Sequence, residues 1–384
     1  MPPLRLLTAV PICDGHDSAI NTINLELIHR GIEVIYLGYH RSVKDIVRAA
    51  IQEDVVAIGL SSYNGGHVEF FAEVINRLES ARLQPRIAVF GGGGGTITSA
   101  DAERMCRYGV SRIFFAGTPL EEIGRFIESA FGEVSLAVPD RIDNDQTLAR
   151  YLTLAENGMD RPPPCKSGQP PKVIGFTGPG GAGKTTLIDE LALRFLASRA
   201  PEKRLAILSH DPSIVSSGAL LGDRATMIYC QDDRVFMRSM ATRGMSGGLS
   251  SSTERALQLL AQCGLFELIM VETVGTGQEA IPFGIQKPLV DQVVLVLPPD
   301  YGSRLQLQKI AMLDVADLIV VNKSDLHGSR TAVTEIEARI RGNQKKQSYL
   351  LSQANRHRDP GVDQIFNFLF HNSDGGSREK VLTF

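Results

Sequence analysis

Short runs of apolar, often β-branched residues alternate with helical patterns along the first third of the chain. Between these runs, apolar residues recur at helical spacing, as in the segment 20–31, which closes on a glycine. Strands that alternate with crossover helices predict a parallel sheet with helices on both faces. The predicted strands are 5–10, 33–38, 55–62, 86–91 and 112–117.

The alternation stops near residue 131 and restarts at Lys172. Between these points lie a short helical pattern, at about 144–157, and the segment RPPPCKSGQPPK, whose five prolines cannot sustain a helix or a central strand. We therefore expect two different α/β domains, a proline-rich linker and a poorly ordered tail. The predicted boundaries are 1–135 for the first domain, 136–171 for the linker, 172–372 for the second domain and 373–384 for the tail.

Charge and cysteine content narrow the class of protein. The net charge of −3 gives no electrostatic reason to expect nucleic acid as a partner. No apolar run approaches the roughly 18 residues that a membrane span needs. The five cysteines are widely spaced and form no C-x-x-C pair, which favours reduced thiols over disulfides or a zinc site. We therefore expect a cytoplasmic protein with neither nucleic acid nor membrane as a partner.

The segment VIGFTGPGGAGKTT, residues 173–186, fits the phosphate-loop pattern G-x-x-x-x-G-K-[ST]. An apolar strand precedes it and an amphipathic helix follows, as the pattern requires. Its glycines allow backbone N–H groups to wrap phosphates at a helix N-terminus. Lys184 is predicted to neutralise the β- and γ-phosphates, and Thr185 to bind Mg²⁺. The predicted phosphate-binding residues are Gly178, Gly180, Gly181, Ala182, Gly183, Lys184, Thr185 and Thr186.

The segment LIVVNKSD, residues 318–325, indicates which base is bound. A carboxylate at Asp325 can accept hydrogen bonds from both N1–H and the exocyclic amine of guanine, whereas adenine offers no such pair of donors. Asn322 and Lys323 are expected to shape the pocket. A later segment, LLSQAN, is expected to offer backbone N–H groups to guanine O6 around Ser352 and Ala354. The sequence therefore predicts GTP or GDP as the ligand.

Acidic residues at strand ends are candidates for Mg²⁺ binding and GTP hydrolysis. Glu272 and Gly275 form Glu-x-x-Gly where GTPases usually carry Asp-x-x-Gly, so Glu272 is expected to hold a Mg²⁺-bound water and the Gly275 N–H to sense the γ-phosphate. Asp211 and Asp223 follow other predicted strands; they either reach Mg²⁺ or are solvated loop acids. Gln278 is a candidate for orienting the attacking water, although its spacing differs from the usual GTPase glutamine.

The motifs HDPS, GALLGDRATM, VETVGTGQ and NKSD, in this order, resemble the G-protein chaperones associated with methylmalonyl-CoA mutase. These chaperones belong to the metallochaperone branch of the P-loop GTPases. The resemblance implies that Asp211, Asp223 and Glu272 together form the Mg²⁺ and switch constellation. It also implies a GTP hydrolase that acts on a metal cofactor.

The stretch DGHDSAIN, residues 14–21, follows the first predicted strand. Parallel sheets bind ligands at the carboxyl ends of their strands, near the point where the strand order reverses. In a flavodoxin-like, Rossmann-type order 2-1-3-4-5, the glycine-rich loops after the third and fourth strands lie beside His16. Asp14 can hydrogen-bond one imidazole nitrogen and raise the basicity of the other, as beside metal-bound histidines.

These loops resemble the cobalamin-binding module of adenosylcobalamin-dependent mutases, whose pattern is Asp-x-His-x-x-Gly, Ser-x-Leu and Gly-Gly. Ala19 replaces the motif glycine and Tyr63 replaces the leucine, and both departures are shared with the fused isobutyryl-CoA mutases. The resemblance implies that His16 binds the cobalt of adenosylcobalamin. It also implies that Ser61 and Tyr63 line the pocket for the cofactor's tail. The predicted cofactor-binding residues are Asp14, His16, Ser61, Tyr63, Gly91, Gly92 and Gly93.

Both resemblances together predict a GTP-hydrolysing metallochaperone that binds adenosylcobalamin and gates its delivery to, or protection in, an acyl-CoA mutase. The chain ends at Phe384, so we expect the large substrate-binding subunit to be a separate chain. The expected partners are that subunit, an adenosyltransferase as cofactor source, and a second copy of this chain, joined through the G domain.

Two alternatives remain open. In the first, the chain is the cobalamin-binding half of an isobutyryl-, 2-hydroxyisobutyryl- or methylmalonyl-CoA mutase, or a piece of a fused mutase, and its GTPase is an accessory. In the second, the chain is a cobalamin-responsive regulator or a P-loop ATPase of unrelated purpose.

Overall fold

The computed structural model describes residues 3–371 apart from 13, 17, 84, 133–136, 160–169, 214–217, 276–280, 286–287, 302–309, 344 and 346. The chain divides into two compact units. The first combines Met1–Val173 with Glu202–Val274, and the second combines Ile174–Pro201 with Gly275–Phe384. Each unit thus contains segments that are distant in sequence, and the domain boundaries predicted from the sequence stay a prediction. Residues 136 and 160–169 of the predicted linker, and the whole tail, lie outside the described residues.

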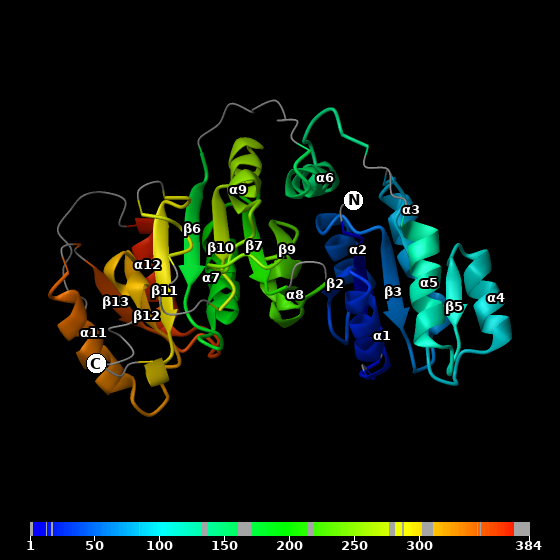
Figure 1. The fold of residues 1–384 in the computed structure, drawn as a ribbon, viewed down its shortest axis with the longest axis horizontal. Coiled ribbons are helices and arrows are strands. Elements are labelled where there is room, and N and C mark those ends of the chain that lie inside the picture. Colours follow the sequence, from blue (N-terminus) through cyan, green and yellow to red (C-terminus); the bar gives the residue numbers. More distant parts are fainter. Residues whose placement is uncertain are drawn as a thin grey trace. The chain divides into compact units, whose positions relative to one another are not determined.

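A parallel sheet with the strand order β5-β4-β3-β1-β2-β8 runs through the first unit (Figure 1). Its first five strands in chain order are those predicted from the sequence, and the predicted order 2-1-3-4-5 is confirmed. The sixth strand was not predicted, since it comes from much later in the chain and pairs with β2, with Ala219 opposite Glu33. The strands are β1 (Arg5–Ala9), β2 (Glu33–Tyr36), β3 (Ala57–Ser61), β4 (Ala88–Gly92), β5 (Arg112–Phe114) and β8 (Ala219–Leu221).

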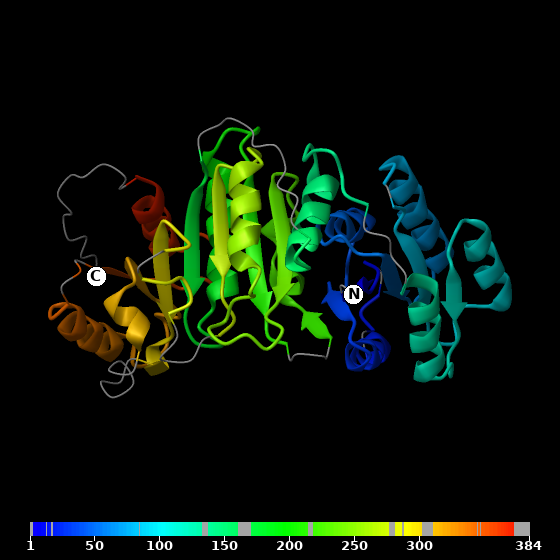
Figure 2. The same cartoon turned by 45° about the horizontal axis from the view of Figure 1, so that its top comes forward.

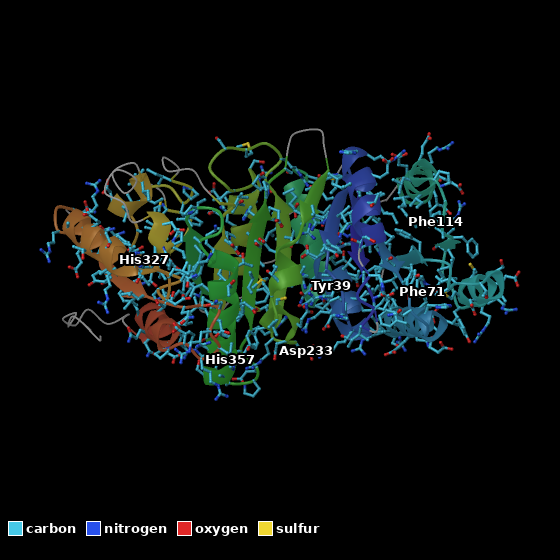
Figure 3. All side chains as sticks on the ribbon, turned by 90° about the horizontal axis from the view of Figure 1, so that it is seen from below. Tyr39, Phe71, Phe114, Asp233, His327 and His357 are labelled. Atoms are coloured by element: carbon cyan, nitrogen blue, oxygen red, sulfur yellow. The ribbon has the colours of Figure 1, made fainter. Side chains whose placement is uncertain are left out.

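Helices cover both faces of this sheet because successive strand residues point to opposite sides. Leu6 belongs to the apolar cluster under α1 and α5, whereas the next residue, Leu7, belongs to the cluster under α2, α3 and α4. Figure 3 labels Phe71 and Phe114, one from each cluster. The helices are α1 (Ser18–His29), α2 (Val43–Gln52), α3 (His67–Ser80), α4 (Ser99–Arg107) and α5 (Leu120–Phe131).

The first unit also contains three parallel strands from the second half of the chain, in the order β10-β7-β9. The helix predicted at about 144–157 is α6, and it packs against α2 and α9 (Figure 2). Because α6 contacts elements from both parts of the unit, it helps to hold them together. The elements are α6 (Asp145–Glu156), β7 (Leu205–Asp211), α8 (Asp223–Thr226), η1 (Tyr229–Gln231), β9 (Val235–Ala241), α9 (Thr253–Gln262) and β10 (Leu268–Glu272).

A buried ionic cluster joins these elements, and Glu53 at the C-cap of α2 is its centre. Arg5 of β1 donates to Glu53 Oε2 at 2.8 Å, and Arg224 of α8 donates to Oε1 at 3.2 Å. The backbone N–H and the hydroxyl of Ser239 in β9 donate to the same carboxylate. A single carboxylate of α2 thus binds β1 from the start of the chain and two elements, α8 and β9, from its second half.

A second layer of charges surrounds this carboxylate. Arg238 Nη2 donates to Glu156 Oε1 at 2.6 Å, and Arg243 pairs with both Glu156 and Glu33. Burial raises the pKa of Glu156, but the neighbouring charges of Arg238, Arg5 and Arg243 lower it by a larger amount. The net shift of this pKa is therefore downward. We call Arg5, Glu33, Glu53, Glu156, Arg224, Arg238 and Arg243 the Glu53 cluster.

The second unit is built on parallel strands in the order β13-β12-β11-β6. The strand and helix predicted on either side of the phosphate loop are β6 and α7. No helix in the described parts of the chain is long and apolar enough to cross a membrane. The elements are β6 (Lys172–Thr177), α7 (Lys184–Ser198), β11 (Gln292–Leu297), η2 (Pro299–Tyr301), η3 (Ala311–Asp314), β12 (Leu318–Val321), α11 (Ser329–Ile340), β13 (Ser348–Leu351) and α12 (Pro360–His371).

Replacement of Glu53 tests the role of the ionic cluster in stability. Glu53→Ala leaves Arg5 and Arg224 buried without their common acceptor, and removing one partner of a buried pair costs about 3–5 kcal/mol. Glu53→Gln keeps the side-chain volume and is expected to cost less. The matched control is Glu121→Ala, which removes an ion pair in which the glutamate is 69% exposed. Urea denaturation of the full chain measures the free energies of unfolding; equal midpoints for Glu53→Ala and the control would contradict the role.

Candidate functional site

The loop after β1 carries Asp14 and His16 to the carboxyl end of the first sheet. The Asp14 side chain is fully buried, and its Oδ1 accepts hydrogen bonds from the His16 backbone at 3.0 Å and from His16 Nδ1 at 2.8 Å. Its Oδ2 accepts from the backbone N–H groups of Tyr63 and Asn64. Asp14 therefore joins the loop after β1 to the loop after β3, and the predicted bond between Asp14 and the imidazole is present.

These contacts keep Asp14 ionised and orient the His16 ring. Burial raises the pKa of Asp14, but the backbone N–H groups of Tyr63, His16 and Asn64 and the His16 ring together lower it to about 2. A charged carboxylate at Nδ1 keeps the proton on that nitrogen and leaves the lone pair on Nε2. The His16 side chain is 60% exposed. The arrangement thus fits a metal ligand that presents Nε2 to a bound cofactor.

Tyr63 packs on this histidine. The two ring centroids lie 4.7 Å apart with an angle of 38° between the ring planes. The hydroxyl of Thr96, in the loop after β4, donates to the Tyr63 carbonyl at 2.6 Å. Ser61 is the last residue of β3 and lies half-buried opposite Gly92. The loops after β1, β3 and β4 therefore meet at His16.

The glycine run after β4 allows the neighbouring strands and loops to approach. A Cβ atom on Gly93 would lie 1.8 Å from the Ser62 carbonyl oxygen, and one on Gly94 would lie 2.2 Å from the Tyr63 ring. Gly91 and Gly92 meet the Leu60 and Phe114 carbonyls in the same way. The space that these glycines free is filled by protein atoms. Their contact with a cofactor stays a prediction.

Large apolar side chains are exposed after several strands of this sheet, and one of them, Tyr63, packs on His16. Ile12, Tyr39, Tyr63 and Phe115 follow β1, β2, β3 and β5, and each is exposed; Figure 3 labels Tyr39. Exposed apolar side chains that gather in one place usually mark a binding surface. The edge of the sheet therefore combines one imidazole ligand with an apolar surface, which suits a large macrocyclic cofactor.

The phosphate loop lies between β6 and α7 in the second unit. Its backbone has positive φ at Gly178, Gly181 and Gly183, a conformation that glycine adopts without steric cost. Lys184 Nζ donates to the carbonyls of Gly178 and Pro179, each at 3.2 Å. A Cβ on Gly275 would lie 2.6 Å from Gly180, so only glycine fits there. The loop thus has the cradle that phosphates require.

Asn322 connects the phosphate loop to the two predicted base-binding segments. Its Nδ2 donates to the Ala182 carbonyl at 2.9 Å, and its Oδ1 accepts from Ser352 Oγ at 3.0 Å and from Ala354 N at 3.1 Å. Lys323 holds a positive φ, and Asp325 is exposed to solvent. The structure therefore brings these predicted nucleotide-binding residues together within one unit.

The carboxylates Asp211, Asp223 and Glu272 form an acidic group in the first unit. Burial and the nearby charges of Asp223 and Glu272 raise the pKa of Asp211 to about 8. The Ser209 hydroxyl donates to Asp223 Oδ2. A cation would relieve the repulsion that raises this pKa. Among the described residues no three His, Cys, Asp or Glu side chains could hold a metal ion by themselves, and Mg²⁺ usually relies on phosphates and waters for several of its ligands.

His210 is a structural member of this group that the sequence analysis missed. It is buried, its Nδ1–H donates to the Glu272 carbonyl at 2.8 Å, and its Nε2 lies 2.8 Å from Thr253 Oγ1. Burial lowers the pKa of His210 to about 4, so the ring is neutral at physiological pH. A histidine inside an otherwise apolar strand was the signal that could have identified it. Gln278 lies outside the described residues.

Comparisons with known proteins agree with this geometry. Residues 148–371 match the family "Methylmalonyl Co-A mutase-associated GTPase MeaB", and residues 4–123 match the B12 binding domain. The chain belongs to the MeaB family of GTPases. The predicted fold class is thereby confirmed. Cobalamin and GTP or GDP with Mg²⁺ are confirmed as its ligands at the level of these two domains.

Fused isobutyryl-CoA mutases are among the similar relatives of this MeaB-family chain. The protein from Cupriavidus metallidurans is 36% identical over 95% of this chain and 35% of its own length. Those from Geobacillus kaustophilus and Nocardia farcinica are 36% and 35% identical over 94% and 89% of this chain. They are matched over 36% and 33% of their own lengths, so this chain spans about a third of the curated relatives that it matches.

Acid titration tests the buried carboxylate of Asp14. Because the folded pKa of about 2 lies below the unfolded value, the ionised group stabilises the fold above about pH 4, and this contribution is lost as pH falls towards 2. The difference in unfolding free energy between wild type and Asp14→Asn should therefore be constant above about pH 5 and shrink below pH 4. Urea denaturation at a series of pH values measures it; a difference that stays constant down to pH 2 would contradict the assignment.

Base selectivity tests Asp325. Asp325→Asn replaces a carboxylate, which accepts two hydrogen bonds from guanine, by an amide that suits xanthine better. We expect the affinity for GTP to fall by at least tenfold and that for xanthosine triphosphate to rise. Competition binding to the full chain measures both, with Asp314→Asn as a control at an exposed carboxylate outside the loop. Unchanged selectivity for GTP would exclude Asp325 from the base pocket.

Proposed function

We propose that this MeaB-family chain is a GTP-hydrolysing chaperone that holds adenosylcobalamin on His16. It gates delivery of the cofactor to, or its protection in, an acyl-CoA mutase. The observation that carries the proposal is the buried Asp14 carboxylate, which binds Nδ1 of the exposed His16 ring and leaves Nε2 available for a ligand bond. The phosphate loop and the Asn322 contacts on the same chain support the nucleotide half.

The protein groups have distinct roles in cofactor binding. His16 Nε2 provides the cobalt ligand, and Asp14 fixes the ring and keeps Nδ1 protonated. Tyr63 limits rotation of the imidazole by packing on it, and Ser61 lies at the edge where the cofactor's tail is expected. When bound, adenosylcobalamin supplies the cobalt–carbon bond whose cleavage starts the radical chemistry of acyl-CoA mutases.

GTP hydrolysis requires charge neutralisation around the γ-phosphate. Lys184 and the N–H groups of the phosphate loop would bind the phosphates, and Thr185 would hold Mg²⁺. We further assign Asp211, Asp223 and Glu272 to the Mg²⁺ and switch constellation, with Gln278 orienting the water. The raised pKa of Asp211 supports this assignment, because a cation nearby would restore its ionised form. Hydrolysis is expected to be slow until a partner orders the switch residues.

The relatives favour a second candidate function. Fused isobutyryl-CoA mutases match almost the whole of this chain, so it can instead serve as the cobalamin-carrying part of an active isomerase. Activity with an added mutase large subunit, in the absence of GTP, would favour that function. A large subunit, an adenosyltransferase and a second copy of this chain are our proposed partners, and a cytoplasmic location stays a prediction from cysteine content.

Visible spectroscopy of the full chain with adenosylcobalamin tests the proposed function. Wild type should give the base-off spectrum of histidine-bound cobalamin, and His16→Ala should lose it, because the variant lacks the Nε2 that is proposed to bind cobalt. The variant should bind GTP with unchanged affinity. His29→Ala is the matched control, at the end of α1, and should keep the spectrum. An unchanged spectrum for His16→Ala would contradict the ligand assignment.

A further inference from the structure

The loop after β2, Gly38–Arg41, contacts two other segments. One is the loop after β1 that carries Asp14 and His16, which we call the ligand loop, and the other is α8, the helical turn that begins at Asp223. We call Gly38–Arg41 the bridging loop. All of these residues belong to the first unit. Adjacent residues of the bridging loop make the two contacts, so only a short stretch of backbone separates them.

On one side the bridging loop is attached to the segment that leads to His16. The Val10 N–H donates to the Gly38 carbonyl at 3.0 Å, and the Arg41 N–H donates to the Val10 carbonyl at 3.1 Å. The His40 Nδ1–H donates to the Ile12 carbonyl at 3.1 Å. The His40 ring also lies 3.6 Å from the position that a Cβ on Gly15 would take. Movement of the ligand loop would therefore displace His40.

On the other side the loop holds α8 (Asp223–Thr226). Arg41 Nη2 donates to the Ala225 carbonyl at 2.5 Å. The Ala225 methyl lies 3.7 Å from the Cβ position of Gly38. Next to it, β8 extends the sheet beside β2. The first residue of this turn, Asp223, accepts from Ser209 and contributes to the raised pKa of Asp211.

The backbone of the bridging loop is under constraint. His40 has a φ of 58°, in the left-handed region where a non-glycine residue costs about 1 kcal/mol or more. Such a conformation persists only where contacts on the surrounding residues hold it. Here those contacts come from the ligand loop and from α8. A change in the position of either segment therefore alters the contacts that stabilise the backbone of the bridging loop.

We propose that the bridging loop couples occupancy of the cobalamin site to the acidic group of the GTPase, with Arg41 as a positioning residue for Asp223. The inference rests on the proposed function and deepens it, because it names the regulation of that nucleotide site by the cofactor. Cobalamin bound at His16 orders the ligand loop, and the bridging loop passes this constraint to α8. By linkage, nucleotide binding changes the affinity for cobalamin by the same factor that cobalamin changes the affinity for nucleotide.

The test measures this factor in the full chain in both directions. The affinity for adenosylcobalamin is measured with and without a non-hydrolysable GTP analogue and Mg²⁺, and the affinity for the analogue with and without cobalamin. In wild type the two ratios should be equal and roughly fivefold or more. Arg41→Met, which keeps the side-chain length but cannot donate to Ala225, should bring both ratios to about one. The affinity of this variant for adenosylcobalamin, measured without nucleotide, should stay within about twofold of wild type.

Arg48→Met is the matched control. Arg48 also joins the two parts of the unit, since its Nη1 donates to the Gln231 carbonyl at 2.6 Å and pairs with Asp233 at 2.8 Å, but it lies outside the bridging loop. This variant should keep the wild-type ratio. His40→Gly, which relaxes the backbone and removes the bond to Ile12, should weaken the coupling from the opposite side of the loop.

The outcomes separate this proposal from the proposed function. If Arg41→Met keeps the full ratio while it folds and binds both ligands, the bridging loop is not the coupling element. If wild type binds both ligands independently, the bridging loop is again not a coupling element. The assignments of the two binding sites are unaffected by that result. If wild type shows no histidine-bound cobalamin spectrum, the proposed function itself fails. Equal losses in Arg41→Met and Arg48→Met would indicate general loosening of the unit and would also overturn the specific role of Arg41.

Discussion

The buried Glu53 carboxylate imposes the constraint on which the first unit depends. Glu53 accepts from Arg5, Arg224 and Ser239, which belong to β1, α8 and β9. Charges removed from water are stable only when they are paired and hydrogen-bonded. The cobalamin-binding sheet and the strands that carry the acidic group must therefore fold together, because neither part alone satisfies these side chains.

The two ligand sites depend on the same type of interaction. In each, one buried polar side chain fixes loops that are remote in sequence. Asp14 binds backbone donors of two loops beside His16, and Asn322 joins the phosphate loop to the segment around Ser352 and Ala354. The remaining functional groups stay exposed, as His16 and Asp325 do, so the sites are organised before a ligand arrives.

Much of the fold could be predicted from the sequence because its signals are local. Apolar alternation identified β1 to β5, and the glycines and Lys184 identified the phosphate loop. The strand β8 escaped prediction because it has three residues and pairs with β2. The Glu53 cluster escaped as well, since Glu53 and Ser239 are separated by 186 positions and no local pattern marks their pairing. Gly91, Gly92 and Gly93 were predicted to bind the cofactor; neighbouring residues fill the space beside them, and their contact with the cofactor stays a prediction.

Hydrogen exchange of the full chain, with and without adenosylcobalamin, tests the central claim that the cofactor loop and the acidic group belong to one packed body. The account predicts slower amide exchange on cobalamin binding both near His16 and in the α8 turn, Asp223–Thr226. Protection confined to the loops after β1 and β3, with unchanged exchange in α8, would contradict it.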